Sequence, residues 1–178
     1  IRRNFVPLKK EKMETHKLDN PTWYSLSETR TNFAVDFDGI KFYNPDYCPF
    51  GGFLNLDNTA IGIGKYASLT NNFFVVGNEP NYNEKVVLNN ELICNQMVLD
   101  AEIDVEINEQ IVELQTEIHK VDLFNLVNLV QPDYFKNRTA DLGNYFGIYK
   151  DEKLVAVTGE RMKMDAYTEL SAIVTHPN

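Results

Sequence analysis

The sequence has few cysteines, little positive charge and no long apolar run. Its two cysteines, Cys48 and Cys94, show no repeated spacing and provide neither a disulfide framework nor a zinc site. No apolar stretch approaches the roughly 18 residues of a membrane-spanning helix, and the first residues lack the apolar segment of a secretory signal. The net charge of −9 is opposite in sign to that of a protein that reads nucleic-acid grooves. We therefore expect a cytoplasmic protein with no membrane or nucleic-acid partner.

The chain is long and apolar enough to fold. It has 178 residues, of which 43% are hydrophobic, so it can form one sizeable domain or two small ones. Composition suggests four parts: a basic tail at 1–12, an α/β region at 13–100, an acidic connector at 101–108, and a second region at 109–178. Three scattered histidines do not suggest a metal site.

Turn and cap signals divide the first region into short elements. Asn20 and Pro21 predict the start of a helix, and Asp38-Gly39 between two alternating runs predicts a hairpin with a type I′ turn. The stretch NFFVVGNEP predicts a strand, and EKVVLNNELICNQMVLD predicts two strands on either side of Asn89-Asn90. Gly62 and Gly64 lie in a run that lacks the rest of a nucleotide-binding loop, so a helix or loop is expected there.

The aromatic residues of this region allow two interpretations. Either they pack the core of the hairpin-based sheet, which is the more frequent case, or they line a pocket for a small molecule. The residues concerned are Trp23, Phe33, Phe37, Phe42, Tyr43 and Phe50.

The second region predicts a short strand, a helix and three further strands. Thr116 can cap a helix that ends at Gln131-Pro132, although one longer helix over residues 109–130 is the competing interpretation. A polar turn at 150–152 predicts a hairpin, and the strand from Thr168 to Thr175 completes a meander. The fold class expected for the chain is α/β (α+β), with a mixed, mostly antiparallel sheet flanked by helices.

The run RTADLGNYFGIYKDEKLVAVTGERMKMDAYTELSAIVTHP resembles the central part of the GNAT N-acetyltransferase superfamily, in the bacterial branch with an extra N-terminal region. Residues 109–178 carry the resemblance. It implies the first half of a GNAT core, and a transfer of the acetyl group from acetyl-CoA to a primary amine by direct attack. The acceptor would be a small molecule or a peptide.

The resemblance also implies roles for individual residues. The backbone of Ile173, Val174 and Thr175 would hold the pantetheine arm of acetyl-CoA and polarise the thioester carbonyl. Glu169 would remove the amine proton. Both assignments have a structural alternative: the alternation of Leu170, Ala172 and Val174 also fits an ordinary strand, and Glu169 could pair with Arg161.

Two residues of the loop after the helix match the acceptor side of the family. They are Phe135 and Arg138, although an aromatic residue in a loop more often fills the core. A rival hypothesis from another class is a non-catalytic α/β binding module in which this region is a degenerate scaffold.

The printed sequence stops before the glycine-rich loop that holds the pyrophosphate in the family. We therefore expect these 178 residues to be a fragment with an open sheet edge that favours self-association. We also expect them to be inactive and to bind acetyl-CoA weakly, which tight binding in a calorimetric titration would contradict.

Overall fold

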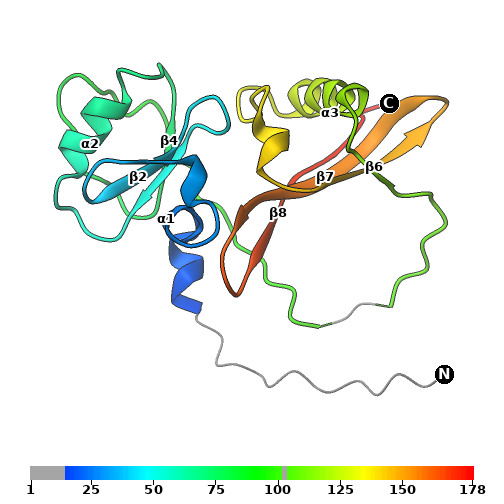
Figure 1. The fold of residues 1–178 in the computed structure, drawn as a ribbon, viewed down its shortest axis with the longest axis horizontal. Coiled ribbons are helices and arrows are strands. Elements are labelled where there is room, and N and C mark those ends of the chain that lie inside the picture. The colour runs from blue at the N-terminus through cyan, green and yellow to red at the C-terminus, as the bar shows by residue number, and fades with distance from the viewer. Residues whose placement is uncertain (1–14, 102–103) are drawn as a thin grey trace.

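The structure is a computed structural model that describes residues 15–101 and 104–178. These residues form two lobes, each built on one four-stranded sheet (Figure 1). The sheet of the N-terminal lobe has the order β1-β2-β3-β4, with β1 (Ala34–Asp36), β2 (Ile40–Tyr43), β3 (Phe50–Phe53) and β4 (Phe74–Val76). The sheet of the C-terminal lobe has the order β5-β6-β7-β8, with β5 (Val112–Glu113), β6 (Tyr145–Lys150), β7 (Lys153–Lys163) and β8 (Thr168–Thr175). The expected mixed and mostly antiparallel α/β fold is therefore confirmed, with the strands divided between two sheets.

The described residues also form three α-helices and three short 3-10 helices. The α-helices are α1 (Pro21–Ser27), α2 (Thr59–Tyr66) and α3 (Glu117–Val130). The 3-10 helices are η1 (Thr15–Asp19), η2 (Thr31–Phe33) and η3 (Thr139–Leu142). The run that contains Gly62 and Gly64 forms α2, so the helix is present, which was one of the two structures expected there.

Local signals in the N-terminal lobe are confirmed. The Asn20 side chain accepts a hydrogen bond from the Trp23 backbone N–H at 3.1 Å, and Pro21 is the first residue of α1. Asp38 and Gly39 both have positive φ, 55° and 125°, as a type I′ turn between β1 and β2 requires. The predicted strand at β4 is present and runs parallel to β3.

Two of the six aromatic residues named above lie in the core of the N-terminal lobe, and the other four are partly buried: Trp23, Phe33, Phe37 and Phe50. Phe42 and Tyr43 are fully buried, and the Phe42 ring stacks on Tyr66 with 3.9 Å between centroids. The core interpretation of the aromatic cluster therefore holds for these residues, and the pocket interpretation does not.

The two strands predicted within 84–100 are wrong. From 77 to 111 the described residues form neither helix nor strand. Asn81 and Val86 still contact the N-terminal lobe, and the described residues after Val86 lead toward the C-terminal lobe (Figure 1). Apolar side chains along it are exposed, including Ile93 and Met97 at 93% each. An isolated pair of strands is marginal without a sheet or helix to pack on, and here neither lobe provides one. The acidic connector proposed at 101–108 lies within this segment and stays a prediction, while the basic tail lies outside the described residues.

The C-terminal lobe begins with a capped helix. The Thr116 hydroxyl accepts a hydrogen bond from the His119 backbone N–H at 3.2 Å, and the His119 ring accepts one from the Thr116 N–H at 3.4 Å. Because β5 and this cap precede α3, the competing single helix over 109–130 is excluded. The helix ends at Val130, as Gln131-Pro132 predicts.

The predicted meander is also present. β6 and β7 form a hairpin about Asp151 and Glu152, and β8 pairs antiparallel with β7. Helix α3 packs on β7 and β8 and covers one face of this sheet (Figure 1). No described helix covers the other face, where Leu170 and Ile173 are 61% and 67% exposed.

The two lobes meet where α1 packs against the end of β7. The Ser25 hydroxyl accepts a hydrogen bond from the Lys163 backbone N–H at 3.1 Å, and Glu28 accepts one from the Asp165 N–H at 2.8 Å. Leu26 and Met162 are buried in the same contact. Side chains at the C-terminal end of α1 thus accept hydrogen bonds from the end of β7 and from the β7–β8 connection, which ties the N-terminal lobe to the two strands that carry the candidate site.

Candidate active site

Strand β8 contains a bulge at Ala172. Val174 pairs with Val157 and Ser171 pairs with Gly159, so Ala172 and Ile173 together face Thr158 alone. Ala172 has a φ of 51°, which a non-glycine residue rarely adopts. The extra residue reverses the alternation, because Leu170 is 61% exposed whereas Val174 is 5% exposed. The ordinary-strand alternative from the sequence is therefore wrong at this point, and a bulge of this kind is frequent beside active sites.

A second irregularity lies three residues earlier on β8. Glu160 pairs with Leu170 and Lys163 pairs with Thr168, so Arg161 and Met162 both face Glu169. The Glu169 carboxylate accepts hydrogen bonds from Arg161 Nη2 at 2.8 Å, from Arg161 Nε at 3.3 Å and from the Met162 backbone N–H at 3.3 Å. The predicted base is therefore held by a guanidinium and a bulged amide, as the structural alternative for Glu169 expected.

Arg161 is held on both sides. Its guanidinium lies over the Phe50 ring, 4.4 Å from the centroid, while its edge faces Glu169. Burial would lower the pKa of Arg161, but the Glu169 carboxylate outweighs burial and keeps that pKa above its ordinary value. The site therefore contains a fixed cation.

The residues predicted to hold acetyl-CoA lie at the open edge of the described sheet. The His176 N–H donates to the Val155 carbonyl at 2.7 Å, which makes these two residues a hydrogen-bonded pair of the ladder. Because such pairs alternate along antiparallel strands, Val174 bonds to β7 and the N–H and C=O of Thr175 point to the edge. Among the described residues β8 has a neighbour on one side only.

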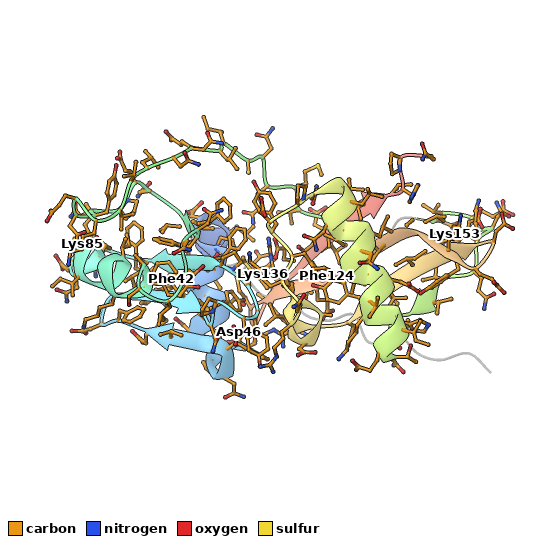
Figure 2. The ribbon with its side chains drawn as sticks, turned by 90° about the horizontal axis from the view of Figure 1, so that it is seen from above. Phe42, Asp46, Lys85, Phe124, Lys136 and Lys153 are labelled. Carbon is orange, nitrogen blue, oxygen red and sulfur yellow. The ribbon has the colours of Figure 1, made fainter. Side chains whose placement is uncertain are left out.

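Two cavities flank the loop that follows α3. The smaller, of about 30 Å³, is lined by Val127, Gln131, Tyr134, Phe135, Thr139, Arg161, Ser171 and Ala172. The larger, of about 470 Å³, is lined by Pro45, Asp46, Phe124, Asn128, Asp133, Phe135, Lys136, Asn137 and Arg138. Figure 2 shows Asp46 of the N-terminal lobe near Phe124 and Lys136 of the C-terminal lobe, so the larger cavity lies between the lobes.

The structure separates the two residues predicted for the acceptor. Phe135 lines both cavities and is 5% exposed, so it also belongs to the core. Arg138 lines only the larger cavity, where it pairs with Asp141 at 3.3 Å and stacks on Tyr47 at 4.1 Å. Phe135 thus lies beside the β8 bulge, and Arg138 does not share its smaller cavity.

The N-terminal lobe contributes aromatic rings to the candidate site, which the sequence did not predict. Phe50 and Phe74 stack at 5.0 Å, and Phe74 stacks on Tyr134 at 5.0 Å. These rings link the Arg161 guanidinium to a residue that lines the smaller cavity. Phe50 was predicted only as part of an aromatic cluster, since no local pattern indicates which strand of the other lobe it faces.

The two cysteines differ in environment, and this predicts their reactivity. Cys48 is fully buried, and burial raises its pKa to about 12, whereas Cys94 is exposed. Because the thiolate is the reactive form, iodoacetamide at neutral pH should modify Cys94 and leave Cys48 unmodified. Mass spectrometry of the native protein checks this, with unfolded protein, in which both react, as the control. Equal labelling of both in the native state would contradict the packing of the lobes described above.

The described part of the chain shows no metal site and no membrane-spanning helix. No three or more His, Cys, Asp or Glu side chains in residues 15–101 and 104–178 come together as metal ligands. No helix in the same residues is long and apolar enough to cross a membrane.

Comparison with solved structures finds a similar fold in a protein from Novosphingobium aromaticivorans that is assigned to the GNAT family of acetyltransferases. The TM-score is 0.64 at 22% sequence identity, over 91% of this chain and 72% of the other. No protein-family model and no curated protein matches the sequence. At this identity the likeness shows the fold alone. The GNAT-type fold that the sequence resemblance predicts is therefore confirmed, and the activity is a matter for proposal.

Proposed function

We propose that the protein is an N-acetyltransferase that transfers the acetyl group of acetyl-CoA to the primary amine of a small molecule or peptide. The observation that carries this proposal is the bulge at Ala172 on the open edge of β8, beside a small cavity that contains a fixed cation. The GNAT-type fold supports the proposal. Phe135, which is predicted to bind the acceptor, lines the same cavity as Ser171 and Ala172 of β8.

The residues present fit the pantetheine arm of acetyl-CoA. The edge of β8 offers main-chain donors and acceptors that the described sheet does not use, and such groups need partners when they are covered. We assign the arm to the backbone of Ile173 to Thr175, with Thr175 supplying its N–H and C=O at the edge. Val174 contributes chiefly through its buried side chain, which fixes the strand on α3.

The chemistry requires a free amine, a proton acceptor and a donor for the carbonyl oxygen. The amine nitrogen forms the new C–N bond and the C–S bond of the acetyl-CoA thioester breaks. The CoA thiolate leaves and takes up the proton that the attacking nitrogen loses, which gives the free thiol. An alkyl amine is mostly protonated near neutral pH, so a base must take its proton before attack. We assign the role of base to Glu169. We assign a backbone N–H at the bulge as the hydrogen-bond donor to the carbonyl oxygen of the thioester.

A proline at Thr175 tests the cofactor assignment. Thr175→Pro removes one edge N–H and leaves the ladder between β7 and β8 intact, since proline is tolerated on the open side of an edge strand. Loss of one hydrogen bond should weaken acetyl-CoA binding by roughly threefold to tenfold. Calorimetry on the natural-length protein measures this, with Thr168→Pro at the first residue of the strand as the control. Unchanged affinity in Thr175→Pro would remove Thr175 from the site.

A glutamine at Glu169 tests the base. Glu169→Gln keeps an oxygen for Arg161 but cannot take a proton, so acetyl transfer should fall by at least roughly a hundredfold. Acetyl-CoA binding should be unchanged, and the remaining rate should rise with pH as free amine becomes available. Release of the CoA thiol with a panel of amines measures both. A rate within a few-fold of the wild type would show that Glu169 serves only to hold Arg161.

A further inference from the structure

We propose that Arg161 binds a carboxylate in the smaller cavity, so that the acceptor amine belongs to an α-amino acid. The carboxylate site stands on the geometry around Arg161, and the naming of its ligand as the acceptor rests on the proposed function. Neither the fold likeness nor the sequence resemblance assigns a role to Arg161.

Arg161 has hydrogen-bond donors that the described residues do not use. A guanidinium has five N–H groups, and Glu169 accepts from Nε and Nη2. No described acceptor binds Nη1. The Arg161 side chain is 15% exposed and lines the smaller cavity. Phe50 on its face and Glu169 on its edge hold the guanidinium in place, which lowers the entropy cost of binding a second carboxylate.

The remaining lining of this cavity is complementary to an anion. Arg161 is the only charged residue among the eight that line it, and Glu169 is not one of them. Thr139 is already engaged, because its hydroxyl donates to the Tyr47 carbonyl and accepts from the Lys136 N–H at 2.8 Å. Gln131 and Ser171 have no side-chain partner among the described residues and can complete the hydrogen bonds of a carboxylate.

The volume of the cavity limits what enters it. One water needs roughly 10–15 Å³ of such space, so about 30 Å³ admits a group the size of two oxygens and excludes a whole substrate. A carboxylate meets this limit and can bind a guanidinium through short, charge-assisted hydrogen bonds. The rest of the acceptor then lies outside the cavity.

The position of the carboxylate determines how far the reacting amine can lie from it in the acceptor. In an α-amino acid the nitrogen lies about 2.5 Å from the carboxylate carbon, as standard bond lengths and angles fix. Ser171 and Ala172 line the same cavity as Arg161, so an amine at this spacing lies next to the β8 bulge, where the acetyl group is proposed to arrive. An amine several bonds further from its carboxylate would lie away from the bulge.

The ligand side of the test uses calorimetry on the natural-length protein without acetyl-CoA. The probes are the twenty common α-amino acids, tested one at a time, then the C-terminal amide of each that binds, and acetate. We expect at least one amino acid to bind, and its amide to bind at least roughly tenfold more weakly because the charge-assisted bonds to Arg161 are lost. Binding of no amino acid would overturn the inference. Equal binding of acid and amide, or acetate binding as tightly as the amino acid, would do the same.

The protein side uses Arg161→Lys, which keeps a cation beside Glu169 and removes the planar donor pair. Amino-acid affinity should fall at least roughly tenfold while acetyl-CoA affinity stays unchanged. Lys153→Arg, an exchange of cations on the far hairpin (Figure 2), is the control and should change neither affinity. Arg138→Lys tests the arginine of the larger cavity. If Arg138→Lys loses amino-acid binding and Arg161→Lys does not, the assignment of the carboxylate to Arg161 is wrong. If Arg161→Lys does not fold, as judged by circular dichroism, the comparison of acid and amide decides.

The outcomes separate this inference from the proposed function. Amino-acid binding without acetyl transfer to any amine would contradict the acetyltransferase and leave the carboxylate site. Acetyl transfer to an amine and to the matching amino acid with equal kcat/KM would support the acetyltransferase and overturn the carboxylate site.

Discussion

Glu169→Ala should lower the free energy of unfolding by about 3 kcal/mol, because it leaves the Arg161 guanidinium largely buried without a counter-ion. The value lies at the low end for buried pairs, since the Glu169 side chain is 30% exposed and solvent screens part of the charge. Loss of the hydrogen bond to the Met162 N–H adds to the same effect. Urea denaturation of the variant and the wild type measures the difference.

Two controls show whether the effect comes from the unpaired charge. Glu109→Ala removes the acid of an exposed pair, Glu109 with Lys150 at 2.9 Å, and should cost less than about 1 kcal/mol. The double variant Arg161→Met with Glu169→Leu removes both charges and should recover most of the stability, because apolar residues of similar size can replace a buried pair. If Glu169→Ala costs no more than Glu109→Ala, Arg161 is better solvated than the structure indicates, and its role as a fixed cation is wrong.

The dependence of Arg161 on Glu169 raises the question of why the proposed base and an arginine share one site. A carboxylate with three hydrogen bonds is well placed, but taking up a proton weakens the bonds that place it. A ligand carboxylate on the free side of Arg161 would compete for the same positive charge. Glu169 would then be held less tightly by Arg161 when the acceptor is present. The proposed carboxylate site and the proposed base therefore support each other chemically.

The parts of the fold that the sequence predicted correctly depend on short-range contacts. Asn20 caps α1, Thr116 caps α3 and Asp38-Gly39 turns β1 into β2 through hydrogen bonds or φ angles within a few residues. Strand β8 was predicted with the bounds Thr168–Thr175 that the structure shows, because its composition and flanking turns mark it. The two caps and the turn are complete within a few residues, whereas β8 also needs its neighbour β7.

The parts that the sequence did not predict depend on distant partners. The apolar run at 84–100 has the composition of strands, yet strands need neighbours, and composition does not show that neighbours are missing. The bulge at Ala172 is hidden for a related reason: Leu170, Ala172 and Val174 alternate as in a regular strand, and only pairing with β7 shows the extra residue. The sequence suggested the pair of Glu169 with Arg161, which lie eight residues apart, but it did not indicate that Phe50 of the other lobe lies against Arg161.

Gly159→Ala should destabilise the protein by about 2 kcal/mol, within the range typical of overpacking. A Cβ atom at Gly159 would lie 2.2 to 2.6 Å from three ring atoms of Tyr145, and real Cβ atoms do not come so close. The Tyr145 ring cannot easily move away, because it is 2% exposed and packs edge-on against Phe135 with 5.6 Å between centroids. Urea denaturation measures the loss.

Two further variants test the stated cause. Gly64→Ala in α2 meets only the end of the Asn83 side chain, at 3.0 Å, and should raise stability by up to about 1 kcal/mol through helix propensity. Gly159→Ala combined with Tyr145→Leu should cost less than the sum of the single changes, because the smaller side chain leaves room for the new methyl group. Full additivity would show that the ring is not what the methyl group meets.

The same substitution connects the core to the candidate site. Gly159 pairs with Ser171 directly before the bulge, and Phe135 transmits any movement of Tyr145 to the wall of the smaller cavity. Gly159→Ala should therefore weaken amino-acid binding more than acetyl-CoA binding, since the first uses the cavity and the second uses the edge of β8. Equal losses of both would indicate that the whole strand has shifted, and that the cavity and the edge do not act as separate sites.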